Sequence, residues 1–387
     1  MSALAGAVLA AQAALALRVV VRLTRTAGGD RVRPERGANG ASVAIVLPVL
    51  DERDRIGPCL DALVAQSSAV REILVVDGGS RDGTQALVGR HAQRDARIRL
   101  VDASPVPWNA TGKAWGLSIG VRAASPAIEW ILFLDADVHA DPDLAPSLVA
   151  HAGRAGVRAL SVATCQQLSG AAEALVHPSL LATLVYRFGS PGRANTDPSA
   201  VQANGQCFLA RRDLLIATGA LESARTSLCE DVTIARAIAA RGEPVGFYEA
   251  DGLVGVRMYA SAREAWRNWP RSLAMRDRFF GWREALGLVE ILLVQALPLP
   301  ALAVAVGLGA PPLVVFLEAA LVACRVGVLA GMARAYPARP FTYWLSPVTD
   351  LPVAARLLAA ALRRRNRWRG LAYVRRPVGW VRSEEAS

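Results

Sequence analysis

Short apolar runs alternate with mixed polar segments between residues 42 and 260. The runs have the length and branched character of buried strands, and they fall at 42–47, 72–76, 98–101, 130–134, 206–210, 245–248 and 253–258. Segments with helical spacing lie between them, at 56–66, 85–91, 111–124, 173–188 and 231–241. This alternation predicts an α/β domain with a mostly parallel sheet, helices on both faces, and ligands bound at the carboxyl ends of the strands.

Longer apolar segments flank this domain. Residues 1–24 are apolar enough for one membrane span, which needs about 20 residues, and a polar linker follows at 25–41. A signal peptide would begin with basic residues, but here the basic residues follow the apolar run. Because cationic flanks stay inside, we expect the amino terminus outside and the domain at 42–260 on the cytoplasmic face of a bacterial membrane.

The chain after the domain alternates between interfacial and membrane-spanning character. Arginine and aromatic residues mix at helical spacing through 261–284, which predicts an amphipathic helix in the membrane interface. Two spans are expected within 285–333, at 285–309 and 312–332. For 334–387 we expect a re-entrant or interfacial helix at 341–362 and a basic tail, since a full crossing would carry three consecutive arginines outside.

Composition supports membrane attachment and excludes several classes. Hydrophobic residues make up 53% of the 387 residues, mean hydropathy is +0.28, and net charge is +11. The arginines gather beside apolar segments and form no nucleic-acid-binding motif, so we expect no nucleic-acid partner. Five scattered cysteines without a CxxC pair argue against a disulfide framework and a zinc site. Lys113 is the only lysine among 44 basic residues.

Acidic residues follow the predicted strands. Asp135 and Asp137 come directly after 130–134, one residue apart on a turn. Two such carboxylates can bind ribose and a divalent cation, Mg²⁺ or Mn²⁺, that neutralises a sugar-nucleotide diphosphate, with Asp137 the main metal ligand. His139 extends the pattern to DxDxH, although a surface histidine is the simpler interpretation. An acidic pair after a strand can also merely cap a turn.

Two more strand ends carry candidate donor-binding residues. Pro48, Asp51 and Glu52 end the first strand, while Asp77, Gly79 and Ser80 belong to a glycine-rich turn after the second. Glycines let the backbone approach a ligand closely, and Asp77 can accept hydrogen bonds from a nucleotide base or ribose. The alternative is a turn whose polar side chains only cap the next helix.

Two further motifs supply a cation and a base. Lys113 ends a Trp-Asn-Ala-Thr-Gly-Lys segment before a helix, and its retention in an arginine-rich chain indicates a need for a compact ammonium beside a phosphate or carboxylate. The Walker A pattern is absent. Glu230 and Asp231 open a later helix, and either carboxylate can take a proton from an acceptor hydroxyl. A helix-capping acid is the competing interpretation.

The order of these residues resembles glycosyltransferase family 2, inverting enzymes with the GT-A fold. The resemblance covers about 42–259 and rests on Asp51 or Glu52, Asp77, Lys113, the Asp135–Asp137 pair and the Glu230–Asp231 pair, taken in order. It implies that the first acid and Asp77 hold the nucleotide, the Asp135–Asp137 pair holds ribose and metal, and Asp231 is the catalytic base. Glu230 is the second choice for the base.

Further segments resemble membrane-bound family members that glycosylate carotenoids and related lipids. The Trp108–Lys113 segment resembles their WNGK motif, interrupted here by Ala110 and Thr111. By the same resemblance, the acceptor side would be lined by Asn204, Gly205, Gln206, Arg257, Trp269 and Arg271. The QxxRW motif of processive polysaccharide synthases is missing, which indicates transfer of a single sugar.

The sequence therefore predicts transfer of one hexose, with glucose from UDP-glucose as the leading donor, to a hydroxyl or carboxyl of a membrane lipid such as a carotenoid. A polyprenyl-phosphate sugar transferase is the alternative within the class, because Arg257 and Arg271 can meet a phosphate. A nucleotidyltransferase would need a glycine-rich loop after the first strand, which is missing. The third possibility is a non-catalytic membrane scaffold, against which the intact set of acids argues.

Overall fold

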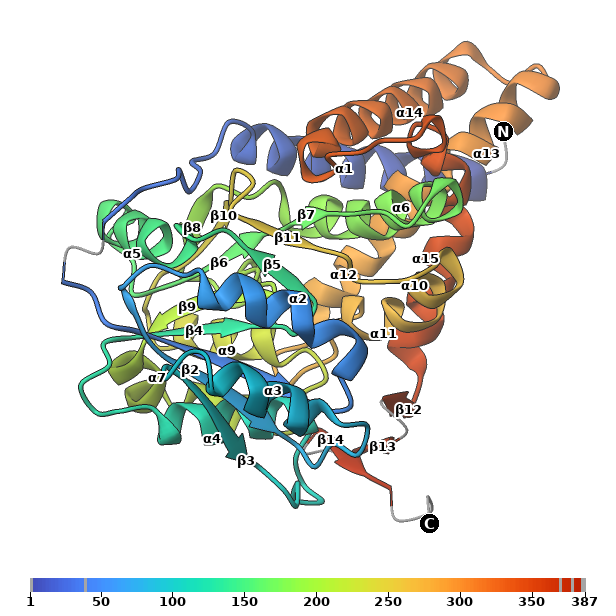
Figure 1. Cartoon of the computed structure of the whole chain (residues 1–387). Coiled ribbons are helices and arrows are strands. Elements are labelled where there is room, and N and C mark those ends of the chain that lie inside the picture. The colour runs from blue at the N-terminus through green and yellow to red at the C-terminus, as the bar shows by residue number, and fades with distance from the viewer. Residues whose placement is uncertain (1–2, 38–39, 369–370, 377–378, 384–387) are drawn as a thin grey trace.

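A computed structural model describes residues 3–37, 40–368, 371–376 and 379–383 (Figure 1). Its centre is an eight-stranded sheet with the order β3-β2-β1-β4-β9-β6-β10-β8. The strands are β1 (Val43–Val49), β2 (Val70–Asp77), β3 (Ile98–Asp102), β4 (Trp130–Leu134), β6 (Ala159–Ala163), β8 (Arg193–Asn195), β9 (Cys207–Arg211) and β10 (Val245–Glu249). This arrangement confirms the predicted α/β class.

Strand direction divides this sheet into two parts. Parallel pairing joins β3, β2, β1 and β4, and separately β6 and β10. β9 lies between the two parts and runs antiparallel to both β4 and β6, and β8 adds an antiparallel edge on β10. Six of the eight strands therefore run in one direction, which confirms the mostly parallel sheet that was expected, and β9 and β8 are the two antiparallel exceptions.

Two layers of helices bury both faces. Alternate β1 residues face opposite sides: Ile45 packs in one core and Val46 in the other. The first core is covered by α2 (Arg53–Val64), α3 (Thr84–Ala92) and α5 (Leu144–Ala155). The second is covered by α4 (Gly112–Ala123), α7 (Arg212–Thr218), α8 (Ala220–Ala224) and α9 (Glu230–Ala239). Burial on both faces explains why the parallel strands are continuous apolar runs.

Four elements that the sequence did not predict lie between residues 135 and 170. They are α5, β6 and the outer strands of a small sheet with the order β5-β11-β7, made of β5 (Val138–Ala140), β11 (Val254–Val256) and β7 (Cys165–Gln166). α5 is interrupted in sequence by Pro146 and Gly153, which weaken its helical signal. Pro146 is tolerated because it lies in the first turn, where its missing N–H has no intrahelical partner to lose.

The apolar helices gather on one side of the domain, where α1 (Ala3–Thr26) and α14 (Pro312–Met332) lie against α6 (Ala171–Phe188) (Figure 1). Two helices, Gly6–Thr26 and Pro312–Ala335, are long and apolar enough to cross a membrane. The segment expected as one span at 285–309 is instead a bent pair, 43° apart, which brings the number to three if the pair is one span.

The bend falls between two elements of different geometry. α12 (Trp282–Glu290) continues into a π-helical turn, η1 (Ile291–Ala296), and α13 (Pro298–Gly307) follows. Pro298 lacks the N–H that would continue the ladder, and a π turn also redirects a helix axis, so both features account for the break. Glu290 is buried here and pairs with Arg18 at 2.6 Å and Arg22 at 2.8 Å, which ties α1 to the bend.

The interfacial and C-terminal segments differ from expectation. The single helix expected at 261–284 is split at Pro270 into α10 (Ala262–Asn268) and α11 (Pro270–Leu273), because proline begins a new helix rather than continuing one. Short helical turns precede α15 (Asp350–Leu362), whose 13 residues give about 20 Å at 1.5 Å per residue, too short to span a membrane of about 30 Å.

The expected basic tail is a three-stranded antiparallel sheet. It contains β12 (Arg365–Trp368), β13 (Leu371–Arg376) and β14 (Gly379–Arg382). Arginines are interspersed with apolar residues in these short strands, so their composition resembles that of a charged tail. Residues 384–387 of that tail lie outside the described residues.

Candidate active site

Two loops at the carboxyl ends of β1 and β2 hold each other in place. The Asp51 N–H donates to Ser80 Oγ at 2.9 Å, and the Arg81 N–H donates back to Asp51 Oδ1 at 2.8 Å. A second link joins the Glu52 N–H to Thr84 Oγ1 at 2.9 Å. Asp51 adopts φ 52°, a left-handed conformation that carboxylate and amide residues tolerate best after glycine. The predicted donor-binding loops are therefore one rigid unit.

Asp77 is the central acceptor of this unit. Its carboxylate is 1% exposed and accepts hydrogen bonds from the Gly79 and Ser80 N–H groups, from the Ser80 hydroxyl, and from Gln85 Nε2 at 2.6 Å. The side chain thus stabilises its own glycine-rich turn. Its role as a nucleotide ligand stays a prediction, and Gln85 is a partner that sequence reasoning did not single out.

Pro48 fixes the distance between β1 and the helix that carries the lysine. A Cβ added at Gly116 of α4 would stand 3.1 Å from the Pro48 Cβ, so helix and strand are in close contact. At Gly120, one turn later, such an atom would stand 2.3 Å from Val46. These two glycines let α4 pack closely on β1, which brings the first turn of α4 to the ends of the strands.

Lys113, in that first turn, links two acidic motifs far apart in the sequence. Its Nζ lies 2.8 Å from Asp135 Oδ1 and 2.8 Å from Glu230 Oε1, and 18% of its side chain is exposed. Burial disfavours the charged amine, but the charges of Asp135, Glu230 and Asp231 together raise the pKa of Lys113 well above its ordinary value. The ammonium is therefore permanently charged at the junction of the predicted donor and acceptor sides.

Asp137 is partly buried and carries an oxygen without a hydrogen-bond partner among the described residues. Among the described residues, its buried Oδ1 makes no hydrogen bond. Burial, with the nearby charges of Asp135 and Glu52, raises the pKa of Asp137 to about 7. An unsatisfied carboxylate oxygen beside a second acid suits a divalent cation such as Mg²⁺, which typically binds one or two carboxylates plus substrate phosphates.

Side chains of the described residues do not by themselves form a complete metal site. No group of three or more histidine, cysteine, aspartate or glutamate side chains within them is arranged to hold a metal ion. His139 is exposed on β5, where it pairs through its backbone with Gly255. The donor set therefore fits a cation held by the Asp135–Asp137 pair and completed by a diphosphate.

Glu230 and Asp231 occupy the first turn of α9 but differ in their partners. Glu230 is 6% exposed and makes the ion pair with Lys113. Burial, together with the charge of Glu230, raises the pKa of Asp231 to about 7. Because such a carboxyl can both lose and accept a proton near neutrality, Asp231 is the better placed of the two to act as a base.

The predicted Asn204–Gln206 segment lies directly under this cluster. A methyl group added at Gly205 would stand 2.7 Å from Lys113 Nζ and 3.3 Å from Asp231 Oδ2. Its neighbours face away, since Asn204 donates to the Val162 carbonyl at 3.3 Å and Gln206 accepts from the Thr164 hydroxyl at 2.6 Å. Gly205 therefore contributes to the site, while Asn204 and Gln206 hold the segment.

The three remaining acceptor-side predictions separate in the structure. Trp269 is 8% exposed and packs between His177, at 4.3 Å between ring centroids, and Tyr259, at 6.3 Å. It stabilises the helices rather than facing the site. Arg257 is exposed beyond the end of β11, and Arg271 lies half-buried on α11, beside a cavity described below.

Sequence reasoning missed the contribution of the C-terminal sheet to the site. The Trp380 N–H donates to the Thr226 carbonyl at 2.8 Å, and the Arg382 N–H donates to the Trp108 carbonyl at 3.0 Å. The Thr111 N–H donates to the Arg225 carbonyl at 2.8 Å, so three distant segments meet beside Lys113. No regular spacing of arginine and apolar residues in 365–382 indicated these strands.

Comparison with known proteins identifies the domain type. Residues 44–219 match the family model described as glycosyl transferase family 2. A stretch of 97 residues is 29% identical to glycosyltransferase AglE of Haloferax volcanii, and it covers 24% of this chain and 30% of that relative, well under two thirds of its length.

The similarity to solved structures extends further along the chain. The mannosyltransferase PcManGT from Pyrobaculum calidifontis, solved with GDP-Man and Mn²⁺, superposes with a TM-score of 0.57 at 21% identity, over 93% of this chain and 98% of that one. Glucosyl-3-phosphoglycerate synthase from Mycobacterium tuberculosis, solved with Mn²⁺, UDP and its product, gives a TM-score of 0.42 at 22% identity, over 62% and 83%. The first of these similarities extends beyond the sheet to the apolar helices.

Proposed function

We propose, from the match of residues 44–219 to glycosyl transferase family 2, that the chain is an inverting, metal-dependent glycosyltransferase that moves one hexose from a nucleotide-diphosphate sugar to a membrane lipid. The observation that carries this proposal is the position of Lys113. Its ammonium pairs with Asp135 of the donor-side acids and with Glu230 beside the candidate base, at 2.8 Å in both cases. One cation therefore joins the two halves of a transfer reaction.

The donor half needs charge neutralisation. A divalent cation bound at Asp135 and Asp137 would supply Lewis-acid stabilisation of the leaving diphosphate. Lys113 adds a second positive charge on the same side, in a largely buried position where electrostatic interactions are stronger than in water. The two hydrogen-bonded loops that carry Asp51 and Asp77 provide a preorganised binding surface for the nucleotide.

The acceptor half needs a base. Asp231 takes the proton of an acceptor hydroxyl, the hydroxyl oxygen forms a bond to the anomeric carbon, and the bond from that carbon to the diphosphate oxygen breaks. The electron pair of the broken bond leaves with the nucleoside diphosphate. Because attack and departure occur on opposite faces of the anomeric carbon, its configuration inverts. A carboxyl acceptor would arrive already ionised and would need Asp231 less.

The membrane helices determine the class of acceptor in this proposal. The two candidate spans and the bent pair support attachment of the domain to a bilayer, and the charge rule supports a cytoplasmic catalytic side in a bacterial membrane. A lipid hydroxyl or carboxyl, as in a carotenoid-type acceptor, is the proposed target. UDP-glucose is the first donor to test, and GDP-mannose is the second, because PcManGT was solved with GDP-Man.

The test uses the purified full chain in detergent with Mg²⁺ or Mn²⁺. Release of nucleoside diphosphate is followed over a panel of UDP- and GDP-sugars, with and without a membrane lipid extract. We expect lipid-dependent turnover of one sugar, and loss of about 100-fold or more in Asp137→Ala.

The matched control is His139→Ala, which removes an exposed neighbour from the same motif and should leave turnover unchanged. Failure of every nucleotide sugar to bind or turn over would remove the transferase proposal and favour a non-catalytic membrane scaffold.

A further inference from the structure

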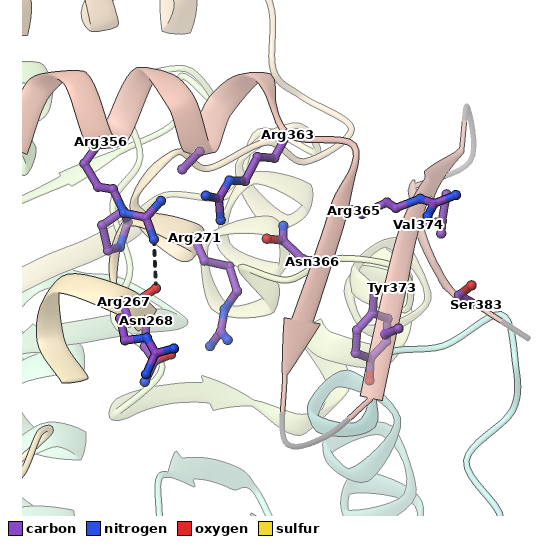
Figure 2. A pocket seen from close by; sticks show the side chains of 13 residues that line it. Arg267, Asn268, Arg271, Arg356, Arg363, Arg365, Asn366, Tyr373, Val374 and Ser383 are labelled. Carbon is purple, nitrogen blue, oxygen red and sulfur yellow. Dashed lines mark hydrogen bonds between the residues drawn. The ribbon is translucent and has the colours of Figure 1, made fainter. Parts of the chain in front are cut away.

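A cavity of about 730 Å³ lies between α10–α11, α15 and the C-terminal sheet (Figure 2). We call it the arginine cavity, because five of its lining residues are arginines: Arg267, Arg271, Arg356, Arg363 and Arg365. None of its thirteen lining residues is acidic. The cations come from α10, α11, β12 and α15 with the residue after it, so the fold brings them together from distant parts of the sequence.

The cavity holds these charges at an electrostatic cost. Arg356 is half-buried, its Nε is buried without a hydrogen-bond partner among the described residues, and its Nη2 reaches only the Arg267 carbonyl at 3.5 Å. Burial and the neighbouring charge of Arg363 lower the pKa of Arg356. Cations kept close together and partly desolvated are stabilised by an anion that enters between them.

Helix polarity explains only part of this arrangement. Arg363 follows the last turn of α15, where the helix dipole favours a cation. Arg267 and Arg271 belong to α10 and α11, and Figure 2 shows Arg356 and Arg363 extending from α15 towards them. The convergence from three helices therefore needs another reason, and a planar guanidinium fork suits phosphate in particular.

Exposed apolar residues lie at both ends of α15. Leu362, directly before Arg363, is 80% exposed. The turns that lead into the other end of the helix expose Phe341 by 75%, Val348 by 58% and Trp344 by 42%. An exposed apolar side chain next to an arginine matches the boundary between acyl chains and headgroups, which favours an anion carried on a lipid over one free in water.

The arginine cavity adjoins the transfer site. Tyr373 lines the cavity and points towards α4, the helix that begins with Gly112 and Lys113 (Figure 2). Burial raises the pKa of Tyr373 and of Tyr259, and the charge of Arg271 counteracts part of both rises. The charge of Asp137 also contributes to the raised pKa of Tyr259. Arg271 of the cavity and Asp137 of the donor side thus both lie close enough to Tyr259 to influence its pKa.

We propose that the arginine cavity binds the phosphate group of an anionic membrane lipid and holds that lipid beside the transfer site. The binding site stands on the cavity itself. Its use to position an acceptor rests on the proposed function, and gives that acceptor a phosphate next to the group that receives the sugar. It therefore favours a phosphate-bearing lipid over a neutral carotenoid.

The experiment is isothermal titration calorimetry of the full chain in neutral detergent. The probes are dioctanoyl phosphatidate, the uncharged dioctanoylglycerol, and inorganic phosphate. We expect phosphatidate to bind at least about tenfold more tightly than either of the others, because it alone combines phosphate and acyl chains. Equal binding of inorganic phosphate would overturn the lipid assignment, and so would displacement of phosphatidate by UDP or GDP, which would assign the arginines to the donor.

Paired variants locate the effect. Arg356→Gln with Arg363→Gln should weaken phosphatidate binding about tenfold or more. The matched control is Arg263→Gln with Arg364→Gln, which removes two exposed arginines of the same segments outside the cavity lining and should change nothing. Equal binding by the first pair and wild type would overturn the site.

Two further measurements keep the outcome interpretable. The single variant Arg363→Gln changes an exposed side chain, and it should show a smaller loss of the same sign if the double variant does not fold. Nucleotide-sugar turnover is measured on the same wild-type sample. Binding through these arginines without any turnover supports the site and removes the transferase proposal, whereas turnover without such binding does the reverse.

Discussion

Two charged clusters in this protein differ in how their charge is balanced. Around Lys113 a single ammonium meets Asp135 and Glu230 at 2.8 Å each, so the folded chain supplies its own counter-charges. The arginine cavity gathers five guanidinium groups with no acid in its lining. The first arrangement keeps reacting groups in place, and the second has no acidic counter-charge among the residues that line it.

This comparison predicts different behaviour on mutation. Removing a member of a balanced cluster leaves a buried opposite charge and disturbs its neighbours. Removing one arginine from the cavity relieves repulsion, so the protein should fold as well as before while its ligand binds less tightly. Variants at the Lys113 cluster should therefore alter the rate of transfer, and variants at the cavity should alter the affinity for lipid.

The largest effect is expected at the candidate base. Asp231→Asn should lower the transfer rate by about 100- to 10,000-fold, the usual contribution of a general base, with nucleotide affinity unchanged. Rates are measured at saturating donor, and affinity by titration with the nucleoside diphosphate. The control is Asp213→Asn, which also changes an acid in the first turn of a helix but pairs only at the surface. Full activity in Asp231→Asn would remove the base assignment.

A smaller effect is expected when the lysine keeps its charge but changes its shape. Lys113→Arg should reduce turnover about 100-fold, because a planar guanidinium cannot occupy the compact position between Asp135 and Glu230. Arg122→Lys, the reciprocal exchange on an exposed position of the same helix, should be neutral. Wild-type rates in Lys113→Arg would show that this position requires a positive charge but not the compact shape of an ammonium.

Gly205 tests the packing beneath the lysine. Its replacement by alanine puts a methyl group 2.7 Å from Lys113 Nζ, so the ammonium must shift from its two carboxylates. We expect turnover to fall by about tenfold or more, since small displacements of reacting groups are costly. Gly89→Ala is the control, because a methyl group there meets nothing within 4 Å. Unchanged kinetics would mean that the cluster tolerates displacement.

The mildest test is the pH profile. Asp231 is active as a carboxylate, and its pKa is raised to about 7 by burial and by Glu230. Activity should therefore rise with pH through about 7, and fall about tenfold between pH 8 and pH 6. Saturating metal is used so that protonation of Asp137 does not contribute. A rate independent of pH over this range would contradict Asp231 as the base of a hydroxyl acceptor.

Much of the donor half could be predicted from sequence. Asp135 and Asp77 directly follow uniform apolar runs, and the ends of parallel strands meet at one edge of a sheet, so strand boundaries alone bring these acids together. The strand at 130–134 has the predicted bounds. Lys113 stood out because it was the single lysine in an arginine-rich chain.

The rest depended on contacts between distant segments. The carboxylate of Asp77 is turned towards Ser80 and Gln85, an orientation set by the local turn and not by residue type. Pro270 splits a helix whose arginine and aromatic pattern looked continuous. The sheet at 365–382 became recognisable only through its bonds to the Thr226 and Trp108 carbonyls. Periodicity predicts elements, but it does not predict which distant loop a short strand will meet.

The single lysine also gives the molecule a built-in reporter. A chain labelled with ¹⁵N-lysine would carry its only side-chain amine signal at the junction of Asp135 and Glu230. Every event that reorganises this junction, such as donor arrival, metal loading or product departure, would change one resonance without overlap from any other residue. Because every other basic side chain counted among the lysines and arginines is an arginine, Lys113 is the one spectroscopically distinct side-chain amine, and it lies at the proposed reaction centre.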